Sequence, residues 1–229
     1  MLYGRRHGRP LRRRKSWLME SLLPELQLER PASGSRLDPY TLFPAPVTEV
    51  RLEVGFGGGE HLAAQAQARP DIGFIGCEPF MNGVAGLLDH AEREHLTNIR
   101  ILADDARFLL DALPDAVIRA CYVLFADPWP KRRHWERRFI GPENLERLAR
   151  VLTDGAELRL ASDDPGLVGW MLEHTWHHPA FEWLARRAED WRSRPEDWPP
   201  TRYEQKAIEA GRRPVFLRFR RRYRGTRAQ

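Results

Sequence analysis

CYVLFADPWPKRRHWERR (residues 121–138) joins the pattern of a buried strand to a loop rich in cations. Residues 121–126 form a short apolar run with aromatic side chains, which is typical of a buried strand. Two prolines follow Asp127 closely, and proline cannot continue a strand ladder because it lacks an N–H and has a fixed φ. We therefore predict that the strand stops at Asp127, with this carboxylate at its carboxyl end.

The loop after Asp127 begins with an aromatic residue, Trp129, that we expect to be exposed, and it contains several permanent cations. The basic side chains of this loop are Lys131, Arg132, Arg133, His134, Arg137 and Arg138. A strand end with an acid, an aromatic ring and clustered cations suits a site where a nucleobase reacts while phosphates are held nearby. From this stretch alone, a strand end followed by a solvated basic turn is the alternative.

Strand and helix patterns alternate on both sides of this stretch. Strands are predicted at 50–56, 73–78, 99–103, 118–126, 157–161, 181–185 and 215–220, and helices at 59–68, 82–95, 106–110, 143–152, 165–176 and 202–210. Repeated β-α units predict an α/β fold, with a doubly wound, mostly parallel seven-stranded sheet and helices on both faces. Ligands bind such sheets outside the carboxyl ends of the strands.

Positive charge gathers at the two ends of the chain. The 229 residues have a net charge of +5, from 37 basic and 32 acidic residues. Residues 1–15 and 212–229 contain fifteen of the basic residues and no acid, so the middle of the chain is acidic. Basic ends on an acidic body indicate a polyanionic partner. Ends that only provide solubility are the alternative.

Proline also divides the chain. Residues 1–48 contain six prolines, which predict a basic, Pro-rich N-terminal arm with at most a turn of helix near 16–23. Residues 49–222 are predicted to form the folded domain, and residues 223–229 a basic C-terminal tail. We expect such an arm to order on meeting its partner.

Several classes of protein are disfavoured by composition. Cys77 and Cys121 lie in apolar runs, so we expect buried thiols, no disulfide framework and no metal site. No apolar run reaches about 18 residues, so no membrane span is expected. Residues 17–28 make a poor signal peptide because two glutamates and a proline interrupt them. A cytoplasmic location is the simplest expectation.

A glycine-rich turn joins the first predicted strand to the first helix, in the sequence EVGFGGGE (53–60). Gly55, Gly57 and Gly59 allow a sharp turn and a close approach of the backbone to a ligand. A dinucleotide fingerprint needs a small residue where Glu60 stands, and an acid there is a poor neighbour for pyrophosphate. The pattern suits a ligand without phosphate, such as S-adenosylmethionine. Glu53 would accept from its ammonium group or hold the loop.

Acids also end the next two strands. Glu78 could accept from both hydroxyls of a ribose, a role expected about 20 residues after the glycines. The third strand ends in Asp104 and Asp105, one of which could accept from an adenine amine, and a helix N-cap is the alternative. A solvated strand end is the alternative for Glu78. Three neighbouring strands that end in acids favour an adenosyl cofactor.

Together these segments resemble the bacterial tRNA guanine N7-methyltransferases, over roughly residues 49–220. The segments that carry the resemblance are LEVGFGGGE (52–60), FIGCEP (74–79), DPWPKRRH with ERRF (127–139), LASD (160–163) and TRYEQKAIEAG (201–211). DPWPKRRH and TRYEQ are far more specific than a glycine turn. Some positions differ from the family pattern: Ala126 replaces a common Pro, Glu136 interrupts a basic stretch, and Pro79-Phe80 replaces a Val-His pair.

The resemblance implies a Rossmann-like methyltransferase that uses S-adenosylmethionine to methylate N7 of a guanosine in tRNA, in the variable loop, often as a monomer. It implies cofactor contacts from Glu53, Glu78, Asp105 and Asp127, beside the glycines, and a catalytic role for Asp127. It implies substrate contacts from Lys131, Asp163, Thr201, Arg202, Tyr203 and Glu204. It implies tRNA contacts from Arg133, His134, Arg137 and Arg138.

The chemistry of guanine N7 sets what such a site must supply. N7 carries an in-plane lone pair and no proton, so it attacks a sulfonium methyl without a general base, and the protein supplies proximity and alignment. Positive charge moves to the purine, which carboxylates of Asp127, Asp163 and Glu204 could stabilise. Trp129 or Tyr203 could stack on the displaced base, and core packing is the alternative for each.

Three other functions are compatible with parts of the pattern. A methyltransferase acting on a base amine of adenine or cytosine would also place an acid, prolines and an aromatic ring after this strand. A non-catalytic RNA-binding protein could retain the same fold. A nucleotide-dependent oxidoreductase is disfavoured by Glu60 and by the surrounding acids.

Overall fold

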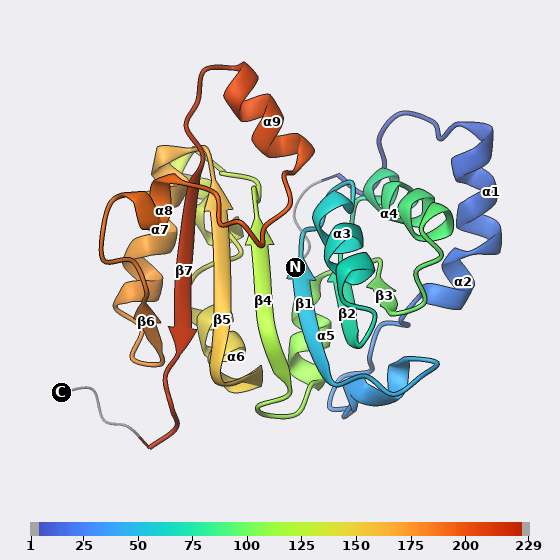
Figure 1. Ribbon diagram of the computed structural model, residues 1–229, viewed down its shortest axis with the longest axis horizontal. Coiled ribbons are helices and arrows are strands. Elements are labelled where there is room, and N and C mark those ends of the chain that lie inside the picture. The colour runs from blue at the N-terminus through green and yellow to red at the C-terminus, as the bar shows by residue number, and fades with distance from the viewer. Residues whose placement is uncertain (1–4, 226–229) are drawn as a thin grey trace. The chain divides into compact units, whose positions relative to one another are not determined.

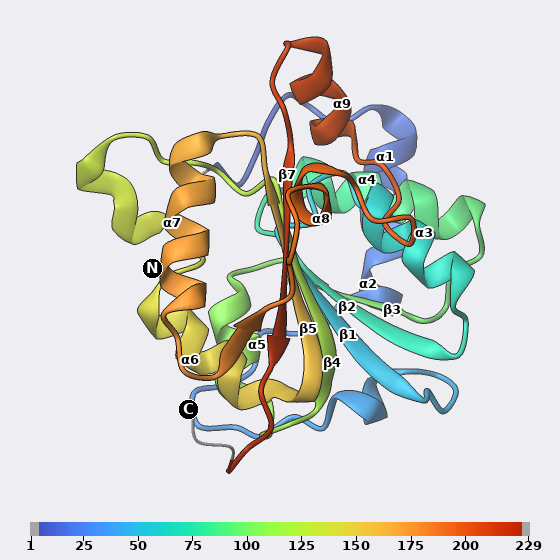
Figure 2. The same ribbon diagram turned by 60° about the vertical axis from the view of Figure 1, so that its left-hand side comes forward.

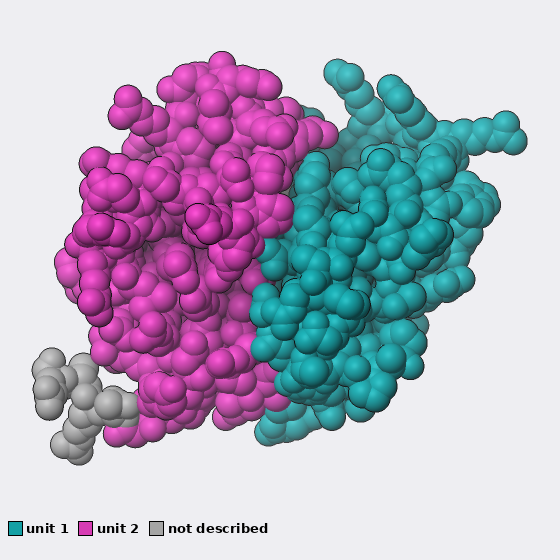
Figure 3. Space-filling model, viewed as in Figure 1, with its two compact units in different colours: residues 1–114 teal, residues 115–229 magenta. Residues whose placement is uncertain are grey.

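The computed structural model describes residues 5–225 of the chain (Figure 1), so the ends of the predicted arm and tail, 1–4 and 226–229, lie outside the described residues. The chain divides into two compact units, residues 1–114 and residues 115–229 (Figure 3). Each unit is an α/β structure, and the two are described separately below. Unit 1 contributes three of the seven strands and unit 2 contributes four.

Unit 1 is built on a parallel set of strands in the order β3-β2-β1. The strands are β1 (Glu49–Val54), β2 (Ile72–Cys77) and β3 (Ile99–Leu102), and the helices after them are α3 (Glu60–Ala68), α4 (Met81–Arg93) and α5 (Ala106–Ala112). All six residues of β2 are buried. A continuous apolar strand of this kind is typical of a parallel sheet covered on both faces.

The segment before β1 is more regular than the prolines predicted. Helices α1 (Arg13–Ser21) and α2 (Leu23–Leu26) and the 3₁₀ helix η1 (Pro39–Leu42) lie in it. Leu18 and Leu26 are buried in the same apolar cluster as Leu88 of α4. Pro24 stands in the first turn of α2, where a missing N–H costs nothing, so it starts a helix instead of preventing one.

Unit 2 has the strand order β4-β5-β7-β6, in which only the β4–β5 pair is parallel. Its strands are β4 (Ile118–Leu124), β5 (Leu152–Ser162), β6 (Phe181–Trp183) and β7 (Val215–Arg221). Its helices are η2 (Arg132–Arg137), α6 (Pro142–Val151), α7 (Pro165–Trp176), α8 (Glu189–Arg192) and α9 (Arg202–Glu209). The chain turns back after α9, so β7 pairs antiparallel with both neighbours.

Several strand ends differ from the sequence-based prediction by one or two residues, and the start of β5 differs by five. Strand β4 ends at Leu124, because Phe125 adopts a left-handed φ of 53° and turns the chain out of the ladder. Asp127 therefore lies in the following turn and not at the last residue of the strand. Strand β5 starts at Leu152, five residues before its predicted start at 157, with Gly155 at φ 77° beside a register shift against β4. Both residues bend the backbone where the apolar pattern gives no signal.

Candidate active site

The glycine-rich turn of unit 1 adopts the conformation that its sequence requires. Gly55, Gly57 and Gly59 have φ values of 73°, 57° and 83°, in a region that side chains disfavour. The N–H of Gly55 donates to the carbonyl of Cys77 at 2.7 Å, which fixes the turn to the end of β2. Gly59 is the N-cap of α3.

Helix α4 supports this turn through two glycines that the sequence analysis did not single out. A Cβ at Gly83 would lie 2.3 Å from the carbonyl oxygen of Gly57, and one at Gly86 would lie 2.8 Å from that of Gly58. Real Cβ atoms do not approach so closely, so α4 must be bare on this face. The i, i+3 spacing of Gly83 and Gly86 within a helical pattern was the available signal.

Glu78 ties the end of β2 to the glycine turn. Its carboxylate is buried and accepts from the N–H of Gly57 at 2.8 Å and from the N–H of Phe80 at 2.9 Å. Backbone donors of this kind stabilise the charged form of a buried acid. The structure thus brings Glu78 and the glycines together, as the sequence predicted.

Glu53 holds the turn from the other side. It is buried, and its Oε2 lies 2.6 Å from Nδ1 of His61 on α3. Of the two roles predicted for Glu53, the contact corresponds to holding the loop. His61 was missed, because nothing in the sequence marks it as the partner.

Asp105 serves as the N-cap of α5. Its Oδ1 accepts from the backbone N–H of Arg107 at 3.0 Å, and its Oδ2 pairs with the Arg107 guanidinium at 2.8 Å. The N-cap alternative is therefore the arrangement observed. Asp105 is also buried, directly after the end of β3.

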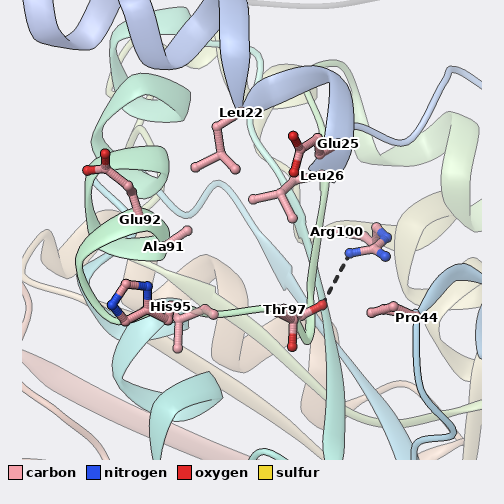
Figure 4. A pocket seen from close by; sticks show the side chains of 10 residues that line it. Leu22, Glu25, Leu26, Pro44, Ala91, Glu92, His95, Thr97 and Arg100 are labelled. Carbon is pink, nitrogen blue, oxygen red and sulfur yellow. Dashed lines mark hydrogen bonds between the residues drawn. The ribbon is translucent and has the colours of Figure 1, made fainter.

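Unit 1 also has a groove of about 480 Å³, which is lined by residues other than those described above. Figure 4 shows its walls, with Leu22 and Leu26 from the α1–α2 region, Ala91 and His95 from the end of α4, and Arg100. None of its lining residues belongs to the predicted cofactor set. We assign it no part in the candidate site.

Asp127 and Trp129 lie in the turn after β4 in unit 2. Asp127 is exposed and has no hydrogen-bond or ion-pair partner within residues 5–225. Trp129 has a left-handed φ of 43°, its ring is half-buried, and the Arg137 guanidinium carbon lies 5.0 Å from the ring centroid. Trp129 is thus placed among cations, at cation–π distance, and not in the core.

The basic loop presents some cations to solvent and buries one. Lys131, Arg132 and Arg133 are exposed, at the start of η2. Arg138 is only 6% exposed, and its Nε donates to the carbonyl of Pro128 at 2.9 Å. Desolvation lowers the pKa of His134, and the charges of Arg137 and Arg133 lower this pKa further, so the ring is neutral at neutral pH.

Asp163 and Glu204 in unit 2 each form an ion pair with an arginine that was not predicted as a partner. Asp163 follows β5 and forms an ion pair with Arg212. Glu204 is buried on α9 and pairs with Arg194 at 3.0 Å. No pattern in the sequence separates these two arginines from the other basic residues of this region.

Thr201 organises the first turn of α9. Its hydroxyl accepts from the N–H of Glu204 at 3.1 Å as the N-cap, which explains the T-x-x-E spacing. Arg202 and Tyr203 are exposed on the same turn. The Lys206 ammonium lies 5.9 Å from the Tyr203 ring.

Residues 5–225 contain neither a metal-binding group nor a membrane-spanning helix. Within residues 5–225, no group of three or more His, Cys, Asp or Glu side chains is placed to hold a metal ion. In the same range, no helix has the length and apolar character needed to span a bilayer.

Comparison with solved structures identifies the fold. A 16S rRNA (adenine(1408)-N(1))-methyltransferase from Catenulisporales acidiphilia, solved with the cosubstrate SAM, superposes with a TM-score of 0.53 at 16% identity, covering 84% of this chain and 96% of that one. An rRNA methylase from Streptococcus thermophilus superposes with a TM-score of 0.52 at 13% identity, covering 76% and 87%. These likenesses confirm the predicted α/β methyltransferase fold.

Sequence comparison identifies the family. A family model described as "Putative methyltransferase" matches residues 48–217. A tRNA (guanine-N(7)-)-methyltransferase from Rhodospirillum rubrum is 53% identical, covering 96% of this chain and 87% of that protein. A protein of the same name from Paramagnetospirillum magneticum is 54% identical, covering 97% and 93%. This chain belongs to the tRNA (guanine-N(7)-)-methyltransferase family.

Proposed function

We propose that this protein transfers the methyl group of S-adenosylmethionine to N7 of a guanosine in the variable loop of tRNA. The observation that carries the proposal is the identity of 53% over 96% of the chain to a relative named for this activity. The geometry within each unit supports it, as the following paragraphs describe.

The residues of unit 1 fit an adenosyl cofactor. The left-handed glycines and the bare face of α4 give a backbone turn that a ligand can approach closely. The buried Glu78 carboxylate has accepting capacity for ribose hydroxyls beyond its two backbone donors. We assign Asp105 to the adenine amine, and Glu53 to holding the turn through His61. When bound, S-adenosylmethionine supplies a methyl group activated on a sulfonium.

The residues of unit 2 suit a nucleophile that needs no general base. Guanine N7 gains positive charge as it is methylated, and a fixed carboxylate stabilises that charge. Asp127 is the one of the three candidates Asp127, Asp163 and Glu204 that has no partner in residues 5–225, so we assign it this role. Asp163 and Glu204 are each held by an arginine, which orients them to accept from the N1–H and amine of guanine. Thr201, Arg202 and Tyr203 flank Glu204 on the substrate side.

Exposed cations provide the contact with the tRNA backbone. Lys131, Arg132 and Arg133 in the basic loop are solvent-exposed, as are Arg9 and Arg12 near the start of the chain. Phosphate contacts of this kind position a nucleic acid without reading its sequence. We propose that they hold the tRNA while the target base leaves its stack. His134 and Arg137 lie beside them and complete the loop.

Three further proposals accompany this function. We propose that the protein acts as a monomer in the cytoplasm. We also propose the division into an arm at 1–48, a catalytic domain at 49–222 and a tail at 223–229. Light scattering of the purified protein checks the first, and a dimeric mass would contradict it.

Strand scission tests the proposed position of the methyl group. An unmodified tRNA transcript is incubated with protein and S-adenosylmethionine, then reduced with borohydride and cleaved with aniline, which cuts at 7-methylguanosine. We expect a single cut in the variable loop. A cut elsewhere would contradict the position, and methyl incorporation without any cut would favour a methyltransferase acting on a base amine. The absence of both cofactor binding and methyl incorporation would favour a non-catalytic RNA-binding protein.

A further inference from the structure

Arg138 differs from the other cations of the basic loop because its side chain is directed into the protein. It caps the end of η2 and is 6% exposed, whereas Arg133 is on the surface. Its Nε donates to the carbonyl of Pro128 at 2.9 Å, and its terminal nitrogens lie 3.5 Å from the carbonyls of Trp129 and Gly166. All three acceptors are backbone oxygens, and two belong to the turn after Asp127.

Aromatic rings hold the guanidinium in this position. Its central carbon lies 5.0 Å from the ring centroid of Trp135 and 5.2 Å from that of Trp170. These two rings are 5.5 Å apart, and Trp170 stacks on His174 at 3.9 Å. Figure 2 shows the yellow-green segment that carries η2 beside the orange helix α7, which supplies Trp170 and His174. The basic loop is therefore anchored to α7 through Arg138.

The turn that Arg138 contacts has an unfavourable backbone. Phe125 and Trp129, on either side of Asp127, have left-handed φ values of 53° and 43°. Bulky residues rarely adopt this conformation, and it persists only where surrounding contacts impose it. Arg138 donates to the Pro128 carbonyl and has a nitrogen 3.5 Å from the Trp129 carbonyl, so it contacts the side of this turn that includes the left-handed Trp129.

We infer that Arg138 is a positioning residue, which sets the conformation of the turn at residues 127–130 and thereby the direction of the Asp127 carboxylate, and is not a ligand of RNA phosphate. This inference rests on the proposed role of Asp127. Lysine cannot replace this arginine, because an ammonium group is a point charge that cannot donate through a planar fork while lying against two neighbouring indole rings.

Kinetics with two variants distinguish a positioning role for Arg138 from a role as a ligand of RNA phosphate. For Arg138→Lys and Arg138→Ala, we expect kcat to fall by about tenfold or more, because a small misplacement of a catalytic group is costly. The dissociation constant for tRNA and its salt dependence should stay close to those of the parent. Arg187→Ala, which removes an exposed arginine of unit 2, is the matched control and should change neither quantity. Melting temperatures establish that each variant is folded.

A double variant tests whether Arg138 acts through Asp127. If it does, Asp127→Ala combined with Arg138→Lys should be no slower than Asp127→Ala alone, because effects within one unit do not add. Additive losses would overturn the inference. So would an Arg138→Ala protein that keeps its kcat but binds tRNA weakly with a flattened salt dependence, which is the behaviour of a phosphate ligand.

Hydrogen exchange provides a readout that does not depend on activity. Peptides covering residues 125–131 should exchange faster in Arg138→Lys than in the parent and in Arg187→Ala. If exchange is faster in Arg138→Lys but the Asp127→Ala enzyme keeps its activity, the proposed role of Asp127 is wrong. The inference that Arg138 positions the turn would still hold. Unchanged exchange in a folded Arg138→Lys protein would overturn the inference itself.

Discussion

At the scale of single residues, the acids predicted for the site fall into two groups. Glu53, Glu78 and Asp105 are buried and already hydrogen-bonded within unit 1. Asp127 is exposed and has no partner in residues 5–225. A carboxylate without a partner costs the folded state nothing to remove and is available to a substrate. The two groups therefore lead to different expectations for mutation.

Removing the Asp127 carboxylate should abolish most activity without harming the fold. For Asp127→Ala we expect kcat to fall by about 100-fold or more, the size of effect seen when one group that stabilises transition-state charge is lost. The melting temperature should stay within a degree or two of the parent, since surface substitutions rarely change stability. Near-normal methyl transfer by the folded variant would refute the assignment.

The contribution of His134 to the affinity for tRNA should depend on whether its ring is protonated. Its pKa is lowered by desolvation first and then by Arg137 and Arg133, so the ring is uncharged at about pH 7.5 and gains a proton only as the pH falls through this lowered value. At about pH 7.5, His134→Gln should therefore leave the salt dependence of tRNA binding unchanged. Well below the ordinary pKa of histidine, near pH 5, the parent should show the steeper dependence. A flatter slope for the variant at pH 7.5 would contradict this charge state.

At the scale of elements, small residues decide whether the glycine turn can form. Helix α4 approaches the carbonyls of Gly57 and Gly58 so closely that only glycine fits at positions 83 and 86. The turn carries the N–H that Glu78 accepts, so the packing of one helix fixes the geometry of the cofactor side. Local backbone contacts, and not charge alone, hold this part of the site together.

A methyl group on α4 should disturb this arrangement. Gly83→Ala places a Cβ against the Gly57 carbonyl, and overpacking of this kind costs about 1–3 kcal/mol of stability, with weaker S-adenosylmethionine binding. Gly169→Ala in α7 is the control, because its Cβ meets nothing within 4 Å and alanine favours a helix by about 0.5–1 kcal/mol. Denaturant melts and calorimetry measure both effects. Equal stability of the two variants would contradict the close approach of α4.

The packing of helix α1 can be tested with neighbouring residues. Leu18 is fully buried in the core of unit 1, whereas Trp17 is 55% exposed. Leu18→Ala should lower the free energy of unfolding by about 2–5 kcal/mol, the range for truncating a buried leucine. Trp17→Ala should change it far less. If both variants unfold like the parent, residues 13–21 do not pack as described.

The sequence predicted elements better than contacts. Strong apolar periodicity placed every strand of the sheet, and glycine, acid and proline patterns placed the turns that carry the site residues. It missed the end of β4, because the left-handed Phe125 breaks a strand without a glycine or proline to announce it. The resemblance implied a tRNA contact for Arg138, and no pattern in the sequence showed that this side chain is buried. The partners His61, Arg194 and Arg212 come from distant positions that no local pattern connects.

At the scale of the whole molecule, both the distribution of charge and the names of the relatives indicate tRNA as the substrate. The chain has a net charge of +5 with its cations concentrated at both ends and after β4, and its relatives are named for methylation of tRNA. Electrostatic attraction to phosphates gives affinity without sequence specificity, so contacts with the base itself must decide which base and which ring nitrogen react. The identity of the methylated atom is therefore the most informative property of the whole protein.

Mass spectrometry of nucleosides tests this most directly. An unmodified tRNA transcript is incubated with the full chain and isotopically labelled S-adenosylmethionine, digested to nucleosides and compared with standards. We predict labelled 7-methylguanosine as the product, at one methyl group per tRNA, and no label in adenosine or cytidine. Label in any other nucleoside, or no label despite cofactor binding, would contradict the assignment of this protein as a guanine N7-methyltransferase.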